Sequence, residues 1–284
     1  MVIKNLMKWA QIFCQYLPQH KYAIDAAQLG DSVELAWTNL GYWQAEENYP
    51  QACQQLADRL AQAVQLKAQD AVLDLGCGQG ASLLHWQNQY QVQYIEAVEL
   101  QQNCVKKIGQ YHLPALKAIY NESFLALKPI QFTQQFDVVL CIDAAYHHAL
   151  SHFLNSVTGH LKQHGHLGFH YLMLSDDWQQ ASLWQKSKYQ LLVKAADLKL
   201  EDLKTQTEMV NLLENYGYEQ IMIQDISSEV LQGFSKYVAK LRNSGQSTIK
   251  NTDYYKIQMT AKLCAQLYAD GLIRYVQISA IKAE

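Results

Sequence analysis

Short apolar runs alternate with amphipathic segments along most of the chain. Helix-like segments separate the first two of these runs, and another follows Asp143. Six runs have the length and composition of β-strands: residues 71–75, 93–100, 136–143, 165–174, 219–226 and 272–282. Alternation of strands and helices is typical of an α/β fold, so we expect a doubly wound, mostly parallel sheet.

Two further segments read as helical additions to this sheet. Residues 1–66 have helical character, and Leu56, Leu60 and Val64 recur there at helix spacing. Residues 175–205 are polar and carry several aromatic side chains. We expect residues 1–66 to form an N-terminal helical cap and residues 67–284 the core. Residues of about 175–205 would be a lid inserted into that core, so that both additions cover one edge of the sheet.

Local signals also mark helices in the last third of the chain. Thr205 and Glu208 have the spacing of a capping box at a helix start. Apolar residues between 230 and 241 fall on one helical face. A last helix over roughly 254–270 is predicted to end at Gly271.

The composition is that of a globular protein with a substantial core. The chain has 284 residues, 49% of them apolar and 17% charged, which fits one large domain. Its net charge of −3 gives no support to a nucleic-acid partner. Six scattered cysteines without a CxxC pair favour a reducing compartment, and no signal peptide or apolar run of spanning length is apparent. We therefore expect a cytoplasmic protein without an integral membrane segment.

A glycine-rich loop follows the first predicted strand, in the stretch VLDLGCGQG. Glycine permits positive φ angles and lets a ligand approach the main chain closely, so the loop predicts a cofactor site. Gly76, Gly78 and Ala81 satisfy the G-x-G-x-x-G/A fingerprint of dinucleotide-binding proteins, with Glu99 near the expected place for a ribose ligand. An NAD(P)-dependent oxidoreductase is therefore one reading.

The acid in front of the loop favours a different cofactor. Asp74 lies two residues before Gly76, where a carboxylate suits an ammonium or sulfonium ligand, and the glycines continue to Gly80. With this D-x-G-x-G-x-G pattern the chain resembles class I S-adenosylmethionine-dependent methyltransferases, over about residues 40–284. It looks most like their small-molecule branch, which includes quinone, tocopherol and natural-product methyltransferases. The resemblance implies a Rossmann-like sheet of seven strands with an antiparallel C-terminal hairpin.

The resemblance also implies a set of cofactor-binding residues. Asp74 and the glycine loop would hold the amino-acid end of S-adenosylmethionine, and Glu99 would hold the ribose hydroxyls. S-adenosylhomocysteine would be the product. The residues implied in cofactor binding are Tyr42, Trp43, Asp74, Gly76, Cys77, Gly78, Gly80, Glu99, Leu100, Glu122, Ser123 and Asp143.

Candidates for the chemistry follow the fourth predicted strand. Methyl transfer needs an aligned, deprotonated nucleophile, and His147 and His148 are candidates for the general base. Tyr146, Trp178 and Trp184 would line an aromatic substrate pocket suited to a flat or apolar acceptor. No metal site is expected, because the histidines lack partners at ligand spacing.

Several alternatives remain open at this stage. An oxidoreductase would need a hydride-transfer apparatus, and no Tyr-x-x-x-Lys pair is apparent. An aminopropyl transferase would need a more acidic acceptor site, and a cofactor-binding protein without turnover would keep the same loop. The acceptor atom is left open between oxygen, nitrogen and carbon, and the oligomeric state between a monomer and a homodimer.

Overall fold

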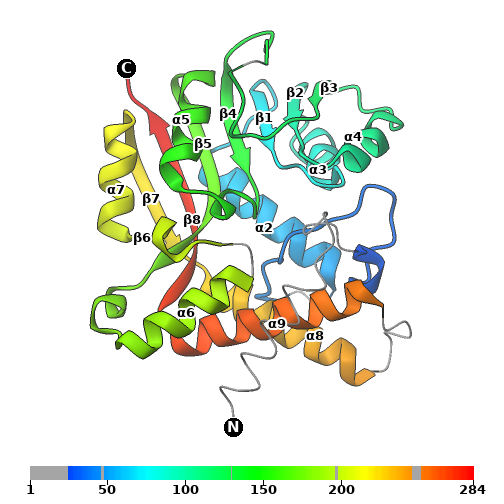
Figure 1. The fold of residues 1–284 in the computed structure, drawn as a ribbon. Coiled ribbons are helices and arrows are strands. Elements are labelled where there is room, and N and C mark those ends of the chain that lie inside the picture. Colours follow the sequence, from blue (N-terminus) through cyan, green and yellow to red (C-terminus); the bar gives the residue numbers. More distant parts are fainter. Residues whose placement is uncertain (1–24, 46–47, 129, 196–197, 245–250) are drawn as a thin grey trace.

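The computed structural model describes residues 25–45, 48–128, 130–195, 198–244 and 251–284. One eight-stranded sheet runs through this part of the chain (Figure 1). The main path of the sheet, in spatial order, is β3 (Leu116–Tyr120), β2 (Tyr94–Val98), β1 (Ala71–Leu75), β4 (Phe136–Cys141), β5 (Leu161–Leu174), β8 (Ile273–Lys282) and β7 (Tyr218–Asp225). A two-residue strand, β6 (Lys204–Thr205), pairs with the end of β5.

The strand directions confirm the predicted fold class. The pairings from β3 to β5 are parallel, whereas β8 runs antiparallel to both β5 and β7. The strand order reverses between β1 and β4, and in such open sheets ligands bind beyond the carboxyl ends of the strands at this switch point. β1 is buried at all five positions, as expected of a central parallel strand covered on both faces.

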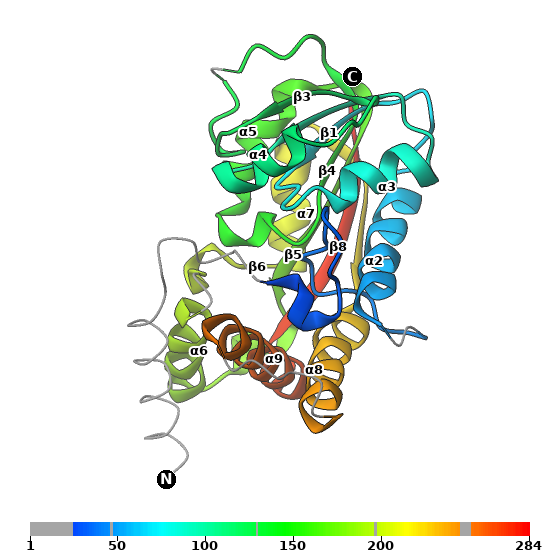
Figure 2. The same cartoon turned by 90° about the vertical axis from the view of Figure 1, so that its right-hand side faces the viewer.

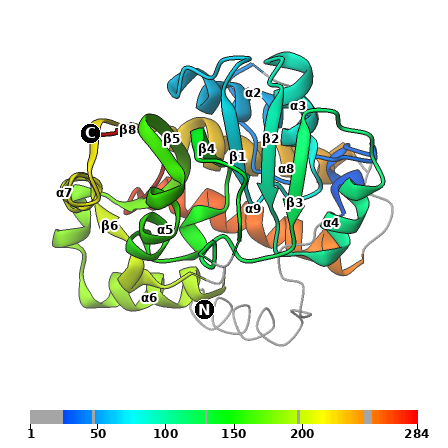
Figure 3. The same cartoon turned by 90° about the horizontal axis from the view of Figure 1, so that it is seen from above.

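Helices cover both faces of the sheet, as Figures 2 and 3 show. On one face lie α2 (Tyr49–Ala63) and α3 (Ala81–Gln89), and on the other lie α5 (Leu150–Val157) and α7 (Gln206–Asn215). The capping box of α7 is present as predicted: the Thr205 hydroxyl accepts from the Glu208 N–H, and the Glu208 carboxylate accepts from the Thr205 N–H. The short α4 (Gln102–Gly109) connects β2 to β3.

A further layer of three helices lies beyond the carboxyl ends of the parallel strands (Figure 1). It consists of α6 (Leu183–Ala195), α8 (Gly233–Ser244) and α9 (Thr252–Asp270). α6 follows β5 and lies within residues 175–205, the segment predicted to form a lid. α8 and α9 are inserted between β7 and β8, so the hairpin predicted at the C-terminus contains a second helical insertion. α9 ends where predicted, at Gly271 with φ +67°.

The structure corrects the expected helix over residues 1–66. Residues 1–24 lie outside the described residues. In the described ranges 25–45 and 48–66, only a short 3₁₀ turn (Ala26–Leu29) and α2 are helical. Residues 30–45 are irregular because their side chains satisfy the backbone locally: Asp31 accepts from the N–H of Trp37, and Asn39 accepts from the N–H of Gly41.

Two strands were not predicted. β3 reads LKAIY and is only half buried at the edge of the sheet, so its alternation of polar and apolar residues is weak. β6 has only two residues. Neither omission affects the strands that carry the candidate site.

Candidate active site

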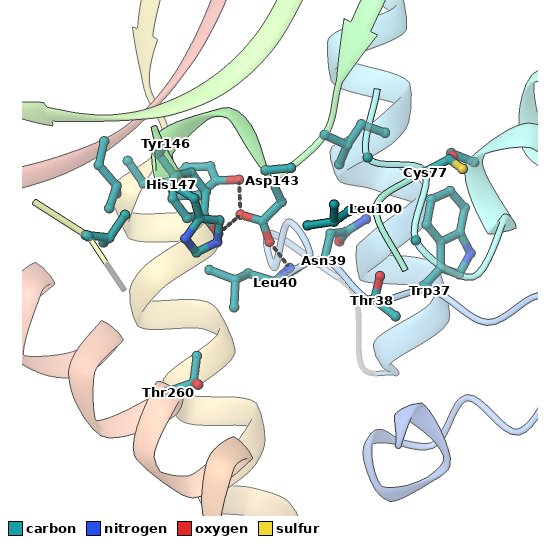
Figure 4. Close-up of a pocket in the computed structure, with 18 of the residues that line it drawn as sticks. Trp37, Thr38, Asn39, Leu40, Cys77, Leu100, Asp143, Tyr146, His147 and Thr260 are labelled. Atoms are coloured by element: carbon teal, nitrogen blue, oxygen red, sulfur yellow. Dashed lines mark hydrogen bonds between the residues drawn. The ribbon is translucent and has the colours of Figure 1, made fainter. Parts of the chain in front are cut away.

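A cavity of about 360 Å³ lies between the carboxyl ends of β1, β2 and β4 and the helical layer (Figure 4). One half is bordered by the glycine loop, Glu99 and the segment 36–40. The other half is bordered by side chains of the helical layer and the residues after β4. Both halves belong to one continuous cavity, which is the arrangement expected of an enzyme that joins a cofactor to an acceptor.

The glycine loop adopts a conformation that residues with side chains rarely take. Gly76, Gly78 and Gly80 have φ angles of +70°, +56° and +93°. A Cβ atom on Gly78 would lie 2.7 Å from the Oγ1 atom of Thr38, which comes from the segment 36–40. The loop is therefore packed so closely that only glycine fits, and its main chain faces the cavity at Gly76, Cys77 and Gly78.

Asp74 lies at the end of β1 and is buried. Its Oδ2 atom accepts a hydrogen bond of 2.7 Å from the indole N–H of Trp86 on α3. Burial raises the pKa of the Asp74 carboxyl to about 6, an effect that the bond from Trp86 partly offsets. The carboxylate borders the cavity, where a cationic ligand group would stabilise its charged form.

Glu99 follows β2 and is held in place by main-chain donors. Its Oε2 atom accepts from the Gly78 N–H at 2.9 Å and its Oε1 atom from the Gln101 N–H at 2.8 Å. Burial raises the pKa of Glu99, and these bonds work against that increase. Each oxygen keeps a second lone pair, so the fixed carboxylate has room for two hydroxyl donors from a ligand.

Asp143 is the centre of a hydrogen-bond cluster after β4. Its Oδ1 atom accepts from the hydroxyls of Tyr146 and Tyr275, both at 2.8 Å, and its Oδ2 atom accepts from the Leu40 N–H at 2.8 Å. Figure 4 shows Asp143 between Tyr146 and Leu40. The residue has a φ angle of +53°, and burial raises the pKa of its carboxyl to about 6. This cluster connects three separate parts of the chain around the cavity.

The charges around the cavity have one sign. Asp74, Glu99 and Asp143 border it, and none of its described lining residues is Lys or Arg. A buried carboxylate without a cationic partner is costly, so the cavity favours a ligand that brings positive charge. The sulfonium and ammonium groups of S-adenosylmethionine meet this requirement, and its ribose hydroxyls match the two oxygens of Glu99. The residues therefore fit the predicted cofactor.

The half of the cavity toward the helical layer, where an acceptor would bind, is lined mainly by aliphatic side chains of that layer, together with Tyr146 and Tyr275. The expected aromatic wall of the lid is wrong: Trp178 packs edge-to-face on Tyr189, and Trp184 is 57% exposed on α6. Neither residue lines the described cavity. The helical layer and the segments beside it instead contribute Leu192, Leu198, Leu231, Met259, Thr260, Leu263, Cys264 and Leu267.

The candidate bases lie at this half of the cavity. Tyr146, His147 and His148 all line it, as the sequence predicts for the segment after β4. The His147 ring lies 4.6 Å from the Tyr146 ring, and the His148 ring packs edge-to-face against Phe124. The main chain at His148 is fixed by a hydrogen bond from the Tyr171 hydroxyl to its carbonyl. Both histidines therefore border the cavity.

Other predicted cofactor residues lie away from the cavity lining. Tyr42 is buried beneath the guanidinium of Arg59, and the Trp43 indole stacks on Tyr237 and donates to the Leu40 carbonyl. These two residues anchor the segment 36–40, which itself lines the cavity. They are therefore supports of the site and not part of its described wall.

The predicted adenine residues also lie outside the described lining. Glu122 is exposed, and the Ser123 hydroxyl accepts from the Leu125 N–H. The neighbouring Asn121 amide instead donates to the carbonyl of Leu100, which does line the cavity. Adenine contacts by Glu122 and Ser123 stay predictions.

Sequence reasoning missed α9 and Tyr275 as parts of the site. Met259, Leu263 and Leu267 form an apolar face that is equally typical of a helix packed in a core. Tyr275 reaches Asp143 from β8, 132 residues further along the chain. No local pattern in the sequence indicates either role.

The comparisons with known proteins agree with this site. A family model described as a methyltransferase domain matches residues 45–222, more than half of the chain. The chain therefore belongs to the methyltransferase-domain family, and the predicted enzyme class is confirmed. No curated protein matches the chain in sequence.

Several solved structures share the fold. The cyclopropane synthase MmaA2 from Mycobacterium tuberculosis has a TM-score of 0.70 and 17% identity, over 95% of this chain and 98% of that chain. The mycolic acid cyclopropane synthase CmaA1, complexed with S-adenosylhomocysteine and CTAB, has a TM-score of 0.71 and 17% identity over the same shares. Geranyl diphosphate C-methyltransferase from Streptomyces coelicolor A3(2), in complex with Mg²⁺, geranyl diphosphate and S-adenosylhomocysteine, has a TM-score of 0.65 and 14% identity, over 92% and 97%. At these identities the likeness establishes the fold.

Proposed function

We propose that this protein transfers the methyl group of S-adenosylmethionine to a small, largely apolar acceptor without an anionic group. The observation that carries the proposal is the cavity itself, in which three carboxylates and no described Lys or Arg adjoin an aliphatic chamber. S-adenosylmethionine supplies an electrophilic methyl group on a positively charged sulfur. Methyl transfer is an in-line displacement that depends above all on holding the two reactants close and aligned.

Different residues of the chain would bind the cofactor and the acceptor. Asp74 and the main chain of the glycine loop would hold the ammonium end of the cofactor, and Glu99 would accept from both ribose hydroxyls. Asp143 would position the acceptor half by fixing Tyr146, Tyr275 and the segment 36–40 around it. His147, or secondarily His148, would take up the proton of an oxygen or nitrogen acceptor.

The acceptor class follows from charge. Geranyl diphosphate, which one of the similar enzymes binds, carries several negative charges. Here a diphosphate would meet carboxylates with no described cation in the lining to balance it, so we do not extend that substrate to this protein. The same reasoning disfavours the pyrophosphate of NAD(P). The aliphatic chamber also disfavours aminopropyl transfer, for which an acidic acceptor site is needed.

The protonation of Asp74 gives a first prediction. We expect the affinity for S-adenosylhomocysteine to rise about tenfold from pH 5 to pH 8, because ionisation through a pKa of about 6 creates the partner of the ligand ammonium. Asp74→Asn should bind more weakly at pH 8 and lose most of this dependence, in calorimetric titrations across the pH range. Asp70→Asn, just before β1 and outside the cavity lining, is the matched control. An unchanged pH dependence in Asp74→Asn would remove Asp74 from the cofactor site.

The function itself is tested by turnover. The protein is incubated with S-adenosylmethionine and a panel of acceptors that share an alkyl or aryl body but end in an amine, an alcohol, a phenol, an alkene or a carboxylate. We expect release of S-adenosylhomocysteine and a product 14 mass units heavier for an uncharged or cationic acceptor, as the replacement of H by CH₃ requires. Binding of S-adenosylhomocysteine without any turnover would leave a cofactor-binding protein. Binding of NADH alone would overturn the proposal.

His147 has a separate expected effect. With an O–H or N–H acceptor, His147→Gln should lower kcat by roughly 10² to 10⁴, the range of general-base catalysis, and leave the affinity for S-adenosylhomocysteine unchanged. His164→Gln, at an exposed position on β5, is the control. If His147→Gln keeps full activity while His148→Gln loses it, the base is His148. If both keep it, positioning alone suffices.

A further inference from the structure

The helical layer carries a charge opposite to that of the whole chain. α6, α8 and α9 together contain seven lysines and one arginine against two aspartates, a net charge of +6. The chain as a whole has a net charge of −3, so its remainder carries −9. The three helices lie side by side at one end of the molecule (Figures 1 and 2). One end of the protein is therefore basic although the protein is acidic.

The same layer exposes large apolar side chains. Among the described residues, eight large apolar side chains are exposed, and four of them lie in this layer. Leu183 is 85% exposed, Trp184 57% and Leu191 46%, all on α6, and Tyr255 of α9 is 56% exposed. At 100° per residue the three side chains of α6 fall on one arc of the helix, together with Lys194. Apolar side chains on a basic helix are typical of a segment that lies on a membrane surface.

The opposite face of α6 borders the acceptor chamber. Tyr189, Leu192 and Val193 are buried, and Leu192 lines the cavity together with Leu198 just after the helix. Leu263 and Leu267 of α9 line it from the neighbouring helix. The layer is thus one helix thick between the aliphatic chamber and the exposed surface with Leu183 and Trp184.

We propose that the outer face of α6, α8 and α9 docks onto an anionic lipid surface. The lysines would approach the lipid headgroups, while Leu183, Trp184 and Leu191 would insert into the boundary of the acyl region. The apolar acceptor would then reach the chamber from the lipid phase, a step that rests on the proposed function, whereas the docking does not. Within the described residues no helix is long and apolar enough to cross a bilayer, so the contact is one of surface binding.

The combination of positive charge and exposed apolar side chains on this layer favours a lipid surface over other partners. The lysines could bind the phosphates of a nucleic acid. A nucleic acid, however, has no hydrocarbon region in which Leu183, which is 85% exposed, could be buried. An acidic protein would also match the positive charge, and the experiment below distinguishes it from a lipid surface. A lipid surface accounts for both properties at once, and Trp is enriched at the depth where headgroups meet acyl chains.

The test is cosedimentation of the whole protein with vesicles. Vesicles of phosphatidylcholine alone are compared with vesicles that contain phosphatidylglycerol, at low and high salt. We expect binding to the anionic vesicles that weakens with salt. Lys186→Glu with Lys194→Glu should weaken binding at least tenfold, since each lysine near such a surface contributes about fivefold. Leu183→Ser with Trp184→Ser should weaken it to a similar extent.

Matched controls keep the result specific to this face. Met222→Ser removes an exposed apolar side chain of β7, and Lys106→Glu with Lys117→Glu reverses two exposed lysines of α4 and β3. Both controls should bind vesicles like the unmodified protein. Each variant is also titrated with S-adenosylhomocysteine, which reports folding and tests the cofactor site independently of lipid.

Three results would overturn the proposal. The first is the absence of binding to anionic vesicles by the unmodified protein. The second is an equal loss of binding in the control variants. The third is a change of oligomeric state or of binding to an acidic protein, without lipid, in the α6 variants only, which would make this face a protein interface.

Discussion

Glu99→Ala is expected to lower the affinity for S-adenosylhomocysteine at least 100-fold. In the proposed function the Glu99 carboxylate accepts from two ribose hydroxyls, and a hydrogen bond to a charged group is worth about 1.5–3 kcal/mol. The substitution also releases the N–H groups of Gly78 and Gln101, which Glu99 now holds at 2.9 and 2.8 Å. Calorimetric titration at pH 8 measures the loss.

The chain offers a close control for Glu99 on β2, the strand that precedes it. Glu96 is also buried, but it lies outside the described cavity lining and accepts from the hydroxyls of Tyr94, Tyr120 and Thr133. Glu96→Gln should lower the melting temperature and leave the affinity for S-adenosylhomocysteine within about twofold, because its partners are structural. If Glu99→Ala folds and binds as tightly as Glu96→Gln, the ribose is held elsewhere.

The cofactor half of the site was predictable because its signal is local. Asp74 and the three glycines lie within seven residues, and the positive φ angles that the loop needs explain why glycine recurs there. Glu99 could be added because β2 is the next strand and parallel strands present their carboxyl ends at one edge of the sheet. Sequence order alone therefore brings these residues together.

The acceptor half was not predictable for the converse reason. Its walls come from α6, α9 and Tyr275 of β8, which are far apart in the sequence. An apolar helix face has the same periodicity whether it packs against a core or against a bound molecule. Trp184 illustrates that composition does not tell which way a side chain points. This aromatic residue of the lid was expected to face the pocket, and it faces outward.

The hydrogen-bond cluster at Asp143 also lies beyond sequence reasoning. Asp143 was recognisable as the acid after β4, but its partners are 3, 103 and 132 residues away. Its φ angle of +53° could not be foreseen either, since Asp enters the left-handed region only where the surroundings impose it. His170 of β5 is one such influence, because its Nδ1 atom accepts from the Asp143 N–H.

Asp143→Ala is expected to destabilise the protein more at pH 5 than at pH 8. At both pH values the substitution leaves the hydroxyls of Tyr146 and Tyr275 and the N–H of Leu40 without their acceptor, at a cost of about 3 kcal/mol in total, and a left-handed alanine adds about 1 kcal/mol. At pH 8 the substitution also removes a buried charge. A pKa raised from 3.8 to about 6 corresponds to about 3 kcal/mol at pH 8, which offsets most of this cost. At pH 5, which lies between the two pKa values, it corresponds to only about 1.5 kcal/mol.

The sign of this difference follows from the direction of the pKa shift. A carboxyl whose pKa is raised in the folded state contributes stability below its unfolded pKa, and that contribution is lost as the pH rises through about 6. The titratable side chains that contact Asp143 add no comparable change in stability between pH 5 and pH 8. Burial raises the pKa of Tyr275 well above 10 and lowers that of His170 to about 3, so both keep one protonation state in the folded protein between pH 5 and 8.

Urea unfolding at both pH values measures the predicted loss, which is about 2.5 kcal/mol at pH 5 and about 1 kcal/mol at pH 8. Tyr146→Phe and Tyr275→Phe each remove one donor and leave the carboxyl in place, so they should show little change between the two pH values. Asp143→Asn tolerates the left-handed backbone and keeps an acceptor for the tyrosines, but its amide group opposes the Leu40 N–H. A loss in Asp143→Ala that is equal at pH 5 and pH 8 would show that the carboxyl is not buried at the cost inferred here. Asp143 would then act only by holding its three hydrogen-bond donors in position.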